Sequence, residues 1–278
     1  MTKNQTSHST AATAVLITAD DGGVGKTTCA IQVATAFKLA NLPVDLFQLD
    51  TKAKLATKTG LPVTSLSIAD QHSARGDDLN AADVIAPWYR AITSMQETGR
   101  SSILEVGGAN AGLFHAGVAE IDVQEDIAAL DLSVTAFLVT RTGEDSALQT
   151  LREAKRLGTT LPGAELVLVR NEVAGCPVAA AAYLDETVRK RYLALFERHV
   201  SIRMPRVRPR SMALYERLHV TPDIVVSWHV DNYGEAIRRS GRPRDEAKIF
   251  VKDVAAWSGV IQDELLRVLP ILGGPSDG

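Results

Sequence analysis

A chain of 278 residues is long enough for one large α/β domain with a substantial core. Hydrophobic residues make up 45% of it and charged residues 23%, and the net charge of −3 argues against a surface that binds polyanions throughout. No apolar run approaches the roughly 18 residues that span a membrane. The two cysteines, Cys29 and Cys176, lack metal or redox spacing, so we expect a protein of the reducing cytoplasm.

Apolar runs alternate with helical segments, which predicts an α/β fold with a mostly parallel sheet covered by helices. The expected strands are Ala14–Ala19, Val44–Leu49, Ser102–Val106, Leu132–Thr140, Glu165–Arg170 and His199–Met204. Helices are predicted at Thr27–Ala40 and at Glu144–Leu157, with Gly158 just past the end of the second. The polar stretch 64–80 is expected to be a surface excursion. We expect residues 1–12 to be a disordered lead-in, 13–270 to be one domain with C-terminal helices, and 271–278 to be a tail.

A phosphate-binding loop is predicted between the first strand and the first helix, where the sequence reads GGVGKTT. Its members are Gly22, Gly23, Val24, Gly25, Lys26, Thr27 and Thr28. The glycines allow backbone N–H groups to face phosphate oxygens, and the helix N-terminus adds partial positive charge. Lys26 would reach the β- and γ-phosphates, and the Thr27 hydroxyl would hold Mg²⁺. Asp20 stands where the strict pattern has its first glycine, and an incidental glycine turn is the alternative.

This loop resembles the deviant Walker A motif of the ParA/MinD family of P-loop ATPases, which implies a three-layer α/β/α fold and ATP as the ligand. The resemblance continues at lower strength along the chain. It implies that Asp50 orients the attacking water near Mg²⁺ and that Glu105 takes the acidic Walker B position. It also implies that Asn171 reads adenine, with Met204 and Pro205 lining the base pocket. The alternatives are a strand-end charge for Glu105 and a turn-forming role for Asn171.

One departure concerns position 21, where the family has a signature lysine that reaches the partner's nucleotide in a two-fold dimer. A carboxylate about 4 Å from a phosphate charge would cost on the order of 4 kcal/mol at an effective dielectric near 20. We therefore expect Asp21 to face solvent, a basic side chain of a partner, or Mg²⁺-bound water. Arg141 and the arginines of residues 203–210 are candidates to replace the missing charge.

Two later segments carry further hypotheses. The basic segment 198–210 offers a contact for DNA phosphates, a dimer contact to nucleotide, or a solvated loop; its candidate DNA contacts are Arg203, Arg206, Arg208 and Arg210. The C-terminal helix has an apolar stripe formed by Phe250, Val254, Trp257, Ile261, Leu265 and Val268. The mixed charges of its polar face favour packing against the domain over binding to a membrane surface.

Together these features predict a Mg-ATP-binding, ParA/MinD-like ATPase that forms a nucleotide-dependent homodimer and acts as a switch. Weak intrinsic hydrolysis would depend on Asp50 and Lys26. The segment Val106–Asn110 and the missing lysine resemble the branch from conjugative and mobilisable plasmids, which implies a role in DNA partitioning, plasmid stability or transfer. The alternatives are a metabolic P-loop enzyme, such as a small-molecule kinase or ATP-dependent ligase, and a nucleotide-binding module that does not hydrolyse.

Overall fold

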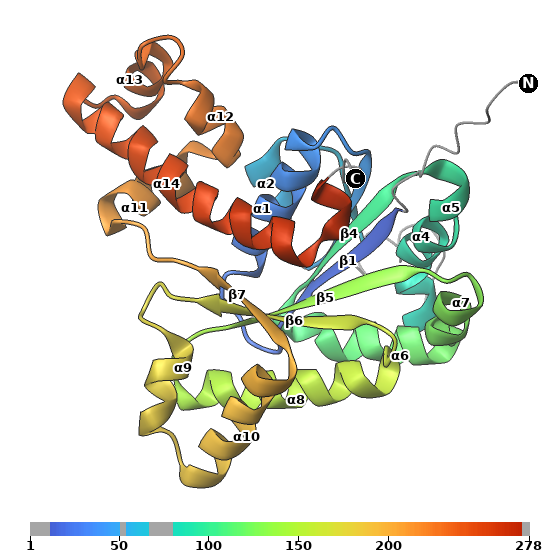
Figure 1. The fold of residues 1–278 in the computed structure, drawn as a ribbon. Helices are drawn as coiled ribbons and strands as arrows, with labels where there is room; N and C mark the ends of the chain where they lie inside the picture. The colour runs from blue at the N-terminus through green and yellow to red at the C-terminus, as the bar shows by residue number, and fades with distance from the viewer. Residues whose placement is uncertain (1–11, 51–53, 67–79, 274–278) are drawn as a thin grey trace, which may run out of the picture.

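A seven-stranded sheet organises the computed structural model, which describes residues 12–50, 54–66 and 80–273 (Figure 1). All neighbouring strands are parallel, in the order β3-β2-β4-β1-β5-β6-β7. The strands are β1 Thr13–Thr18, β2 Val44–Leu49, β3 Val63–Ser65, β4 Ser101–Val106, β5 Ser133–Thr140, β6 Glu165–Asn171 and β7 Val200–Met204. Because β1 lies at the centre, the loop that follows it opens at the middle of the sheet's carboxyl edge.

Helices cover both faces of this sheet (Figure 1). One face carries α1 (Lys26–Leu39), α2 (Lys54–Thr59), α11 (Pro209–Leu218), α12 (Pro222–Ser227), α13 (Gly234–Ser240) and α14 (Arg244–Val268). The other carries α4 (Ala81–Thr93), α5 (Met95–Thr98), α6 (Ala111–Ile121), α7 (Val123–Ala129), α8 (Glu144–Thr160) and α10 (Glu186–Arg198). Shorter segments are α9 (Pro177–Ala180), η1 (Gly108–Asn110), η2 (Ala181–Tyr183) and η3 (Pro270–Gly273). The predicted three-layer α/β/α fold is confirmed.

The central strand β1 shows why the sheet needs both helical layers. Val15 and Ile17 belong to the apolar cluster on the α1 and α14 side, whereas Ala14 and Leu16 belong to the cluster on the α4 and α6 side. Side chains alternate across a strand, so a run without polar residues is buried on both faces. This is the pattern of a strand inside a parallel sheet.

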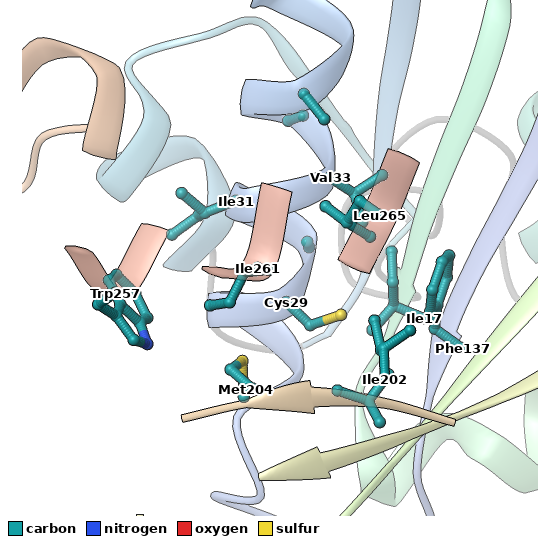
Figure 2. Packing of buried hydrophobic residues seen from close by; sticks show 14 of the residues in the cluster. Ile17, Cys29, Ile31, Val33, Phe137, Ile202, Met204, Trp257, Ile261 and Leu265 are labelled. Atoms are coloured by element: carbon teal, nitrogen blue, oxygen red, sulfur yellow. The ribbon is translucent and has the colours of Figure 1, made fainter. Parts of the chain in front are cut away.

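The long C-terminal helix α14 packs on α1 and β7, as Figure 2 shows for Ile261 and Leu265 beside Cys29, Val33 and Ile202. All six residues of its predicted apolar stripe are buried. Polar contacts reinforce the packing, because Gln262 Nε2 donates to the carbonyl oxygen of Gln32 at 3.0 Å. The expectation that this helix packs against the domain is confirmed.

Several predicted boundaries are shifted by one residue, and three features differ by more. Thr64 and Ser65 belong to the edge strand β3, which is too short to show a periodic pattern. Helix α8 continues past Gly158 to Thr160, because a glycine inside a helix costs only about 1 kcal/mol and buried Leu161 anchors the helix end. The expected tail begins inside η3, where Leu272 is buried. Residues 1–11, 67–79 and 274–278, which include most of the expected lead-in, excursion and tail, lie outside the described residues.

Candidate functional site

The predicted phosphate loop connects the end of β1 to the start of α1. Gly23 and Gly25 have φ angles of +73° and +100°, which side-chain-bearing residues rarely adopt. At Gly25 a side chain would also force its neighbours to shift, because an added Cβ would lie 2.6 Å from Asn171 Nδ2 and 2.9 Å from Met204 Cε. The backbone of this turn is therefore not covered by side chains of Gly23 and Gly25, and α1 begins directly after it at Lys26.

Lys26 is 6% exposed, and its ammonium group faces into the loop. Its Nζ donates to the backbone oxygens of Asp21 at 2.5 Å and Ala19 at 3.4 Å. It forms no ion pair with a carboxylate among the described residues. Burial lowers the pKa of Lys26, against the opposing effect of the nearby carboxylates of Glu105 and Asp50. Among the described residues, Lys26 is thus a buried cation bonded only to backbone carbonyls, and a buried charge without a directly bonded anion is costly.

The carboxyl ends of β2 and β4 meet the start of α1 beside this lysine. The Thr27 hydroxyl donates to Glu105 Oε1 at 2.6 Å, and Gln48 Nε2 donates to Glu105 Oε2 at 3.0 Å. Burial raises the pKa of Glu105, while the hydrogen bond from Thr27 acts in the opposite direction. Asp50 follows β2 and lies against Gly107, where an added Cβ would be 3.0 Å from Asp50 Cγ. Thr27, Glu105 and Asp50 therefore lie in one corner of the site.

The segment after β4 packs closely against the phosphate loop. The Gly107 N–H donates to the Leu49 carbonyl oxygen at 2.7 Å, and Asn110 Nδ2 donates to the same oxygen at 3.2 Å. A Cβ at Gly108 would come within 2.9 Å of the Asp21 carbonyl carbon and oxygen. A movement of the phosphate loop would therefore displace residues 107–110 directly.

Three arginines hold the two carboxylates of the loop. Arg141, which follows β5, lies 3.2 Å from Asp21 Oδ2. From α8, Arg156 lies 3.0 Å and Arg152 3.4 Å from the carboxylate of Asp20. Asp21 thus faces an arginine of its own chain, which corrects the expectation of solvent, a partner's side chain or Mg²⁺-bound water. The negative charge of both carboxylates is therefore offset by arginines of the same chain.

A buried carboxylate that was not predicted from the sequence lies behind the loop. Glu153 in α8 is fully buried, and it accepts a hydrogen bond from Thr18 at 2.6 Å and contacts His115 Nε2 at 3.1 Å. Burial alone would raise its pKa, but the hydrogen bonds from His115 and Thr18 bring it below the ordinary value. One signal was available, since Glu153 lies three residues after Thr150 and four before Leu157, on the buried stripe of the helix.

A cavity of about 420 Å³ adjoins the phosphate loop. It is lined by Gly23, Gly25, Thr28, Asn171, Val173, Met204, Pro205, Arg206, Val207, Pro209, Met212, Ala213, Glu216 and Trp257. All three residues expected to surround a base, Asn171, Met204 and Pro205, are among them. The Asn171 amide donates to the Val24 carbonyl oxygen at 2.7 Å and accepts from the Val173 N–H at 3.1 Å, so it also fixes the loop. The lining by α11 and α14 was not predicted.

The basic segment after β7 is compensated in part by α14. Arg210 lies 2.6 Å from the Glu246 carboxylate and Arg208 lies 3.5 Å from that of Asp253. Arg203 and Arg206 are exposed and form no ion pair with the described carboxylates. Two of the four predicted DNA contacts are therefore neutralised within the chain.

Comparison with known proteins gives a family and a fold. A family model described as the CobQ/CobB/MinD/ParA nucleotide binding domain matches residues 15–177. The structure of the MinD cell division protein of Aquifex aeolicus is 16% identical, with a TM-score of 0.50 over 86% of this chain and 95% of that chain. The MinC:MinD cell division protein complex of the same organism gives 15% identity and a TM-score of 0.48, covering 86% and 93%. No curated protein matches the chain.

The structural likeness to MinD, at this identity, concerns the fold alone. Within the part of the chain that the structure describes, each helix is too short or too polar to cross a membrane.

Proposed function

Because the chain belongs to the CobQ/CobB/MinD/ParA nucleotide-binding domain family, we propose that it binds Mg-ATP and uses the nucleotide as a switch. The observation that carries the proposal is Lys26, a buried ammonium group at the mouth of a glycine turn whose hydrogen bonds, in the described part of the chain, all go to backbone carbonyls. A polyphosphate would bond directly to this lysine, which no carboxylate of the described residues approaches within ion-pair distance. The adjoining cavity of about 420 Å³ lies within the usual size range of ligand sites.

The residues also suit a magnesium ion accompanying the nucleotide. Thr27 and Asp50 would hold the ion or its water, with Glu105 fixing the Thr27 hydroxyl. Among the described residues no cluster of three His, Cys, Asp or Glu side chains could hold a metal alone, and Mg²⁺ at nucleotide sites takes most of its ligands from phosphate and water. When bound, the ion would supply positive charge to the phosphates.

The chain's own residues would then act by positioning. Lys26 and the backbone N–H groups of Gly23–Gly25 would orient the phosphates, and Asp50 would orient water. Residues 107–110 contact both Asp50 and the backbone of Asp21. Their position would therefore depend on whether the terminal phosphate is bound. Such coupling between a phosphate site and neighbouring loops is how nucleotide switches change surface shape.

We propose that nucleotide binding makes the chain form a homodimer in the cytoplasm. This dimer would act in DNA partitioning, plasmid stability or transfer. A DNA contact would rest on Arg203 and Arg206, since Arg208 and Arg210 are paired with α14. A second candidate is a module that binds nucleotide without hydrolysis. It is favoured by Asp21, whose only cationic partner among the described side chains is Arg141 of the same chain.

The test is the light-scattering mass of the protein without nucleotide, in Mg-ADP and in Mg-ATP, beside Asp50→Ala and Lys26→Ala. We expect a dimer in Mg-ATP only, its persistence in Asp50→Ala, and no nucleotide binding by Lys26→Ala. Binding without any change in mass would overturn the dimer switch. Phosphate release equal to that of Lys26→Ala, despite tight binding, would identify the non-hydrolysing module. Failure of the unaltered protein to bind Mg-ATP would overturn the proposal altogether.

A further inference from the structure

A second cavity, of about 410 Å³, lies between α8 and α10 at the amino edge of the sheet. Its position follows from its lining, because Leu166 is the second residue of β6 and His199 directly precedes β7. The phosphate loop lies at the opposite, carboxyl edge. The α8–α10 cavity therefore shares no lining residue with the cavity beside the phosphate loop.

The wall of the α8–α10 cavity is apolar. It is formed chiefly by Ala136, Leu151, Ala154, Leu157, Leu161 and Leu166, which come from β5, β6, α8 and the turn after α8. Leu151, Leu157 and Leu161 are themselves buried, so the wall is part of the packed core. Such a surface favours a hydrocarbon or aromatic body over water.

Every ionisable residue that lines the α8–α10 cavity is basic. These residues are Lys155, Arg191, Arg198 and His199. Lys155, Arg191 and Arg198 form no ion pair with any carboxylate among the described residues, although acids outnumber Lys and Arg by 33 to 30 in the chain. Burial and the charge of Arg198 lower the pKa of His199, so the positive charge near neutral pH comes from the other three. Their side chains are exposed, which places the charge at the mouth of the cavity.

We propose that the α8–α10 cavity binds a small organic carboxylate with an apolar body. The apolar part would rest on the leucine and alanine wall, and the carboxylate would pair with Arg191, Arg198 and Lys155 at the mouth. Arginine suits this role because its guanidinium group can donate two parallel hydrogen bonds to a carboxylate. The cavity volume falls in the range that encloses small ligands. This proposal does not depend on nucleotide binding.

The chain offers two variants that separate the parts of the proposal. Arg191→Gln with Arg198→Gln removes charge from the mouth and leaves the wall intact. Gly158→Leu adds an apolar side chain at a lining position where an added Cβ meets nothing within 4 Å. That change also replaces glycine by a better helix former, so the fold is retained. Arg189→Gln with Lys190→Gln is the matched control, since it removes the same charge from α10 outside the cavity.

The experiment titrates the full chain with octanoate and with 1-octanol, which differ only in the anionic head group, and follows leucine and alanine methyl resonances. We expect octanoate to shift Ala154 and Leu157 and to bind at least tenfold more tightly than octanol. The Arg191 and Arg198 variant should lose about tenfold for octanoate alone, and Gly158→Leu should weaken both ligands. The proposal is overturned if millimolar octanoate shifts none of these methyls, if octanol binds equally well, or if the control variant loses as much affinity.

Discussion

Arg141 and Asp21 join the loops after β5 and β1 through an ion pair of 3.2 Å, with the arginine side chain 42% and the aspartate 20% exposed. The backbone oxygen of the same aspartate accepts a hydrogen bond from Lys26. Arg141 therefore offsets the negative charge of Asp21, the residue whose backbone oxygen is bonded to Lys26. Lys26 is the lysine that we expect to hold phosphate. Together with the ion pairs of Asp20, this pair offsets both carboxylates of the loop that we propose to hold an anionic ligand.

The first prediction concerns this pair. Arg141→Ala should weaken Mg-ATP binding about tenfold, or ~1.4 kcal/mol, because the Asp21 carboxylate would then repel phosphate without compensation. Asp21→Asn should tighten binding by a similar factor. If Arg141 acts only by offsetting Asp21, the double variant should bind no more weakly than Asp21→Asn, as calorimetry of the four proteins can show. Weaker binding by Asp21→Asn alone would contradict this account.

The second prediction tests the tight turn of the phosphate loop. Gly25→Ala should lower the free energy of unfolding by roughly 2–5 kcal/mol, since a side chain is strained at φ +100° and would collide with Asn171. Gly22→Ala is the control, because an added Cβ there meets nothing within 4 Å, and its effect should stay within about 0.5 kcal/mol. Urea unfolding of both variants measures the difference. If Gly25→Ala lowers the free energy of unfolding as little as Gly22→Ala does, the turn tolerates a side chain at position 25 and this account is wrong.

A third expectation concerns the packing of Gly108 on the backbone of Asp21. Gly108→Ala should weaken nucleotide binding, because its Cβ would press within 2.9 Å of that backbone and displace the phosphate loop. Gly112→Ala in α6 adds a methyl group into open space and should raise helix stability by up to about 1 kcal/mol. Calorimetry of the two alanine variants separates contact with the loop from a general glycine effect. An unchanged affinity in Gly108→Ala would show that the loop can move aside.

The fourth prediction is a pH dependence caused by Glu153, which Thr18, His115 and Arg156 surround. Its native pKa lies below the ordinary 4.5, so its ionisation stabilises the fold above that pH. This contribution is lost as pH falls below 4.5 through the native value. Glu153→Gln should lower the free energy of unfolding at pH 7 by about 1–3 kcal/mol.

The difference between wild type and Glu153→Gln should shrink as urea unfolding is repeated from pH 7 down to pH 3.5. Using the difference removes the titration of the other carboxylates, which both proteins share. A gap that stays constant over this range would mean that Glu153 is not the titrating group.

The sequence predicted well the features that depend on residues close to one another along the chain. Six strands stood out as apolar runs, and GGVGKTT predicted the turn that the structure places between β1 and α1. The edge strand β3 was missed because three residues carry no periodicity. The ion pairs of Asp20 with Arg152 and Arg156 join positions more than 130 residues apart. These ion pairs form because α8 packs behind the loop in the folded protein. The spacing of residues along the sequence could not reveal that packing.

Helix α14 has a consequence for how ligand selectivity is divided along the chain. The family match ends at residue 177, yet Met204, Met212 and Trp257 complete the cavity beside the phosphate loop. The residues that we propose to hold phosphate thus lie in the first part of the sequence, whereas much of the wall of the neighbouring cavity comes from the last third. If the proposed function holds, changes in the last third would alter which base fits and leave the phosphate contacts in place, so the two properties could evolve separately.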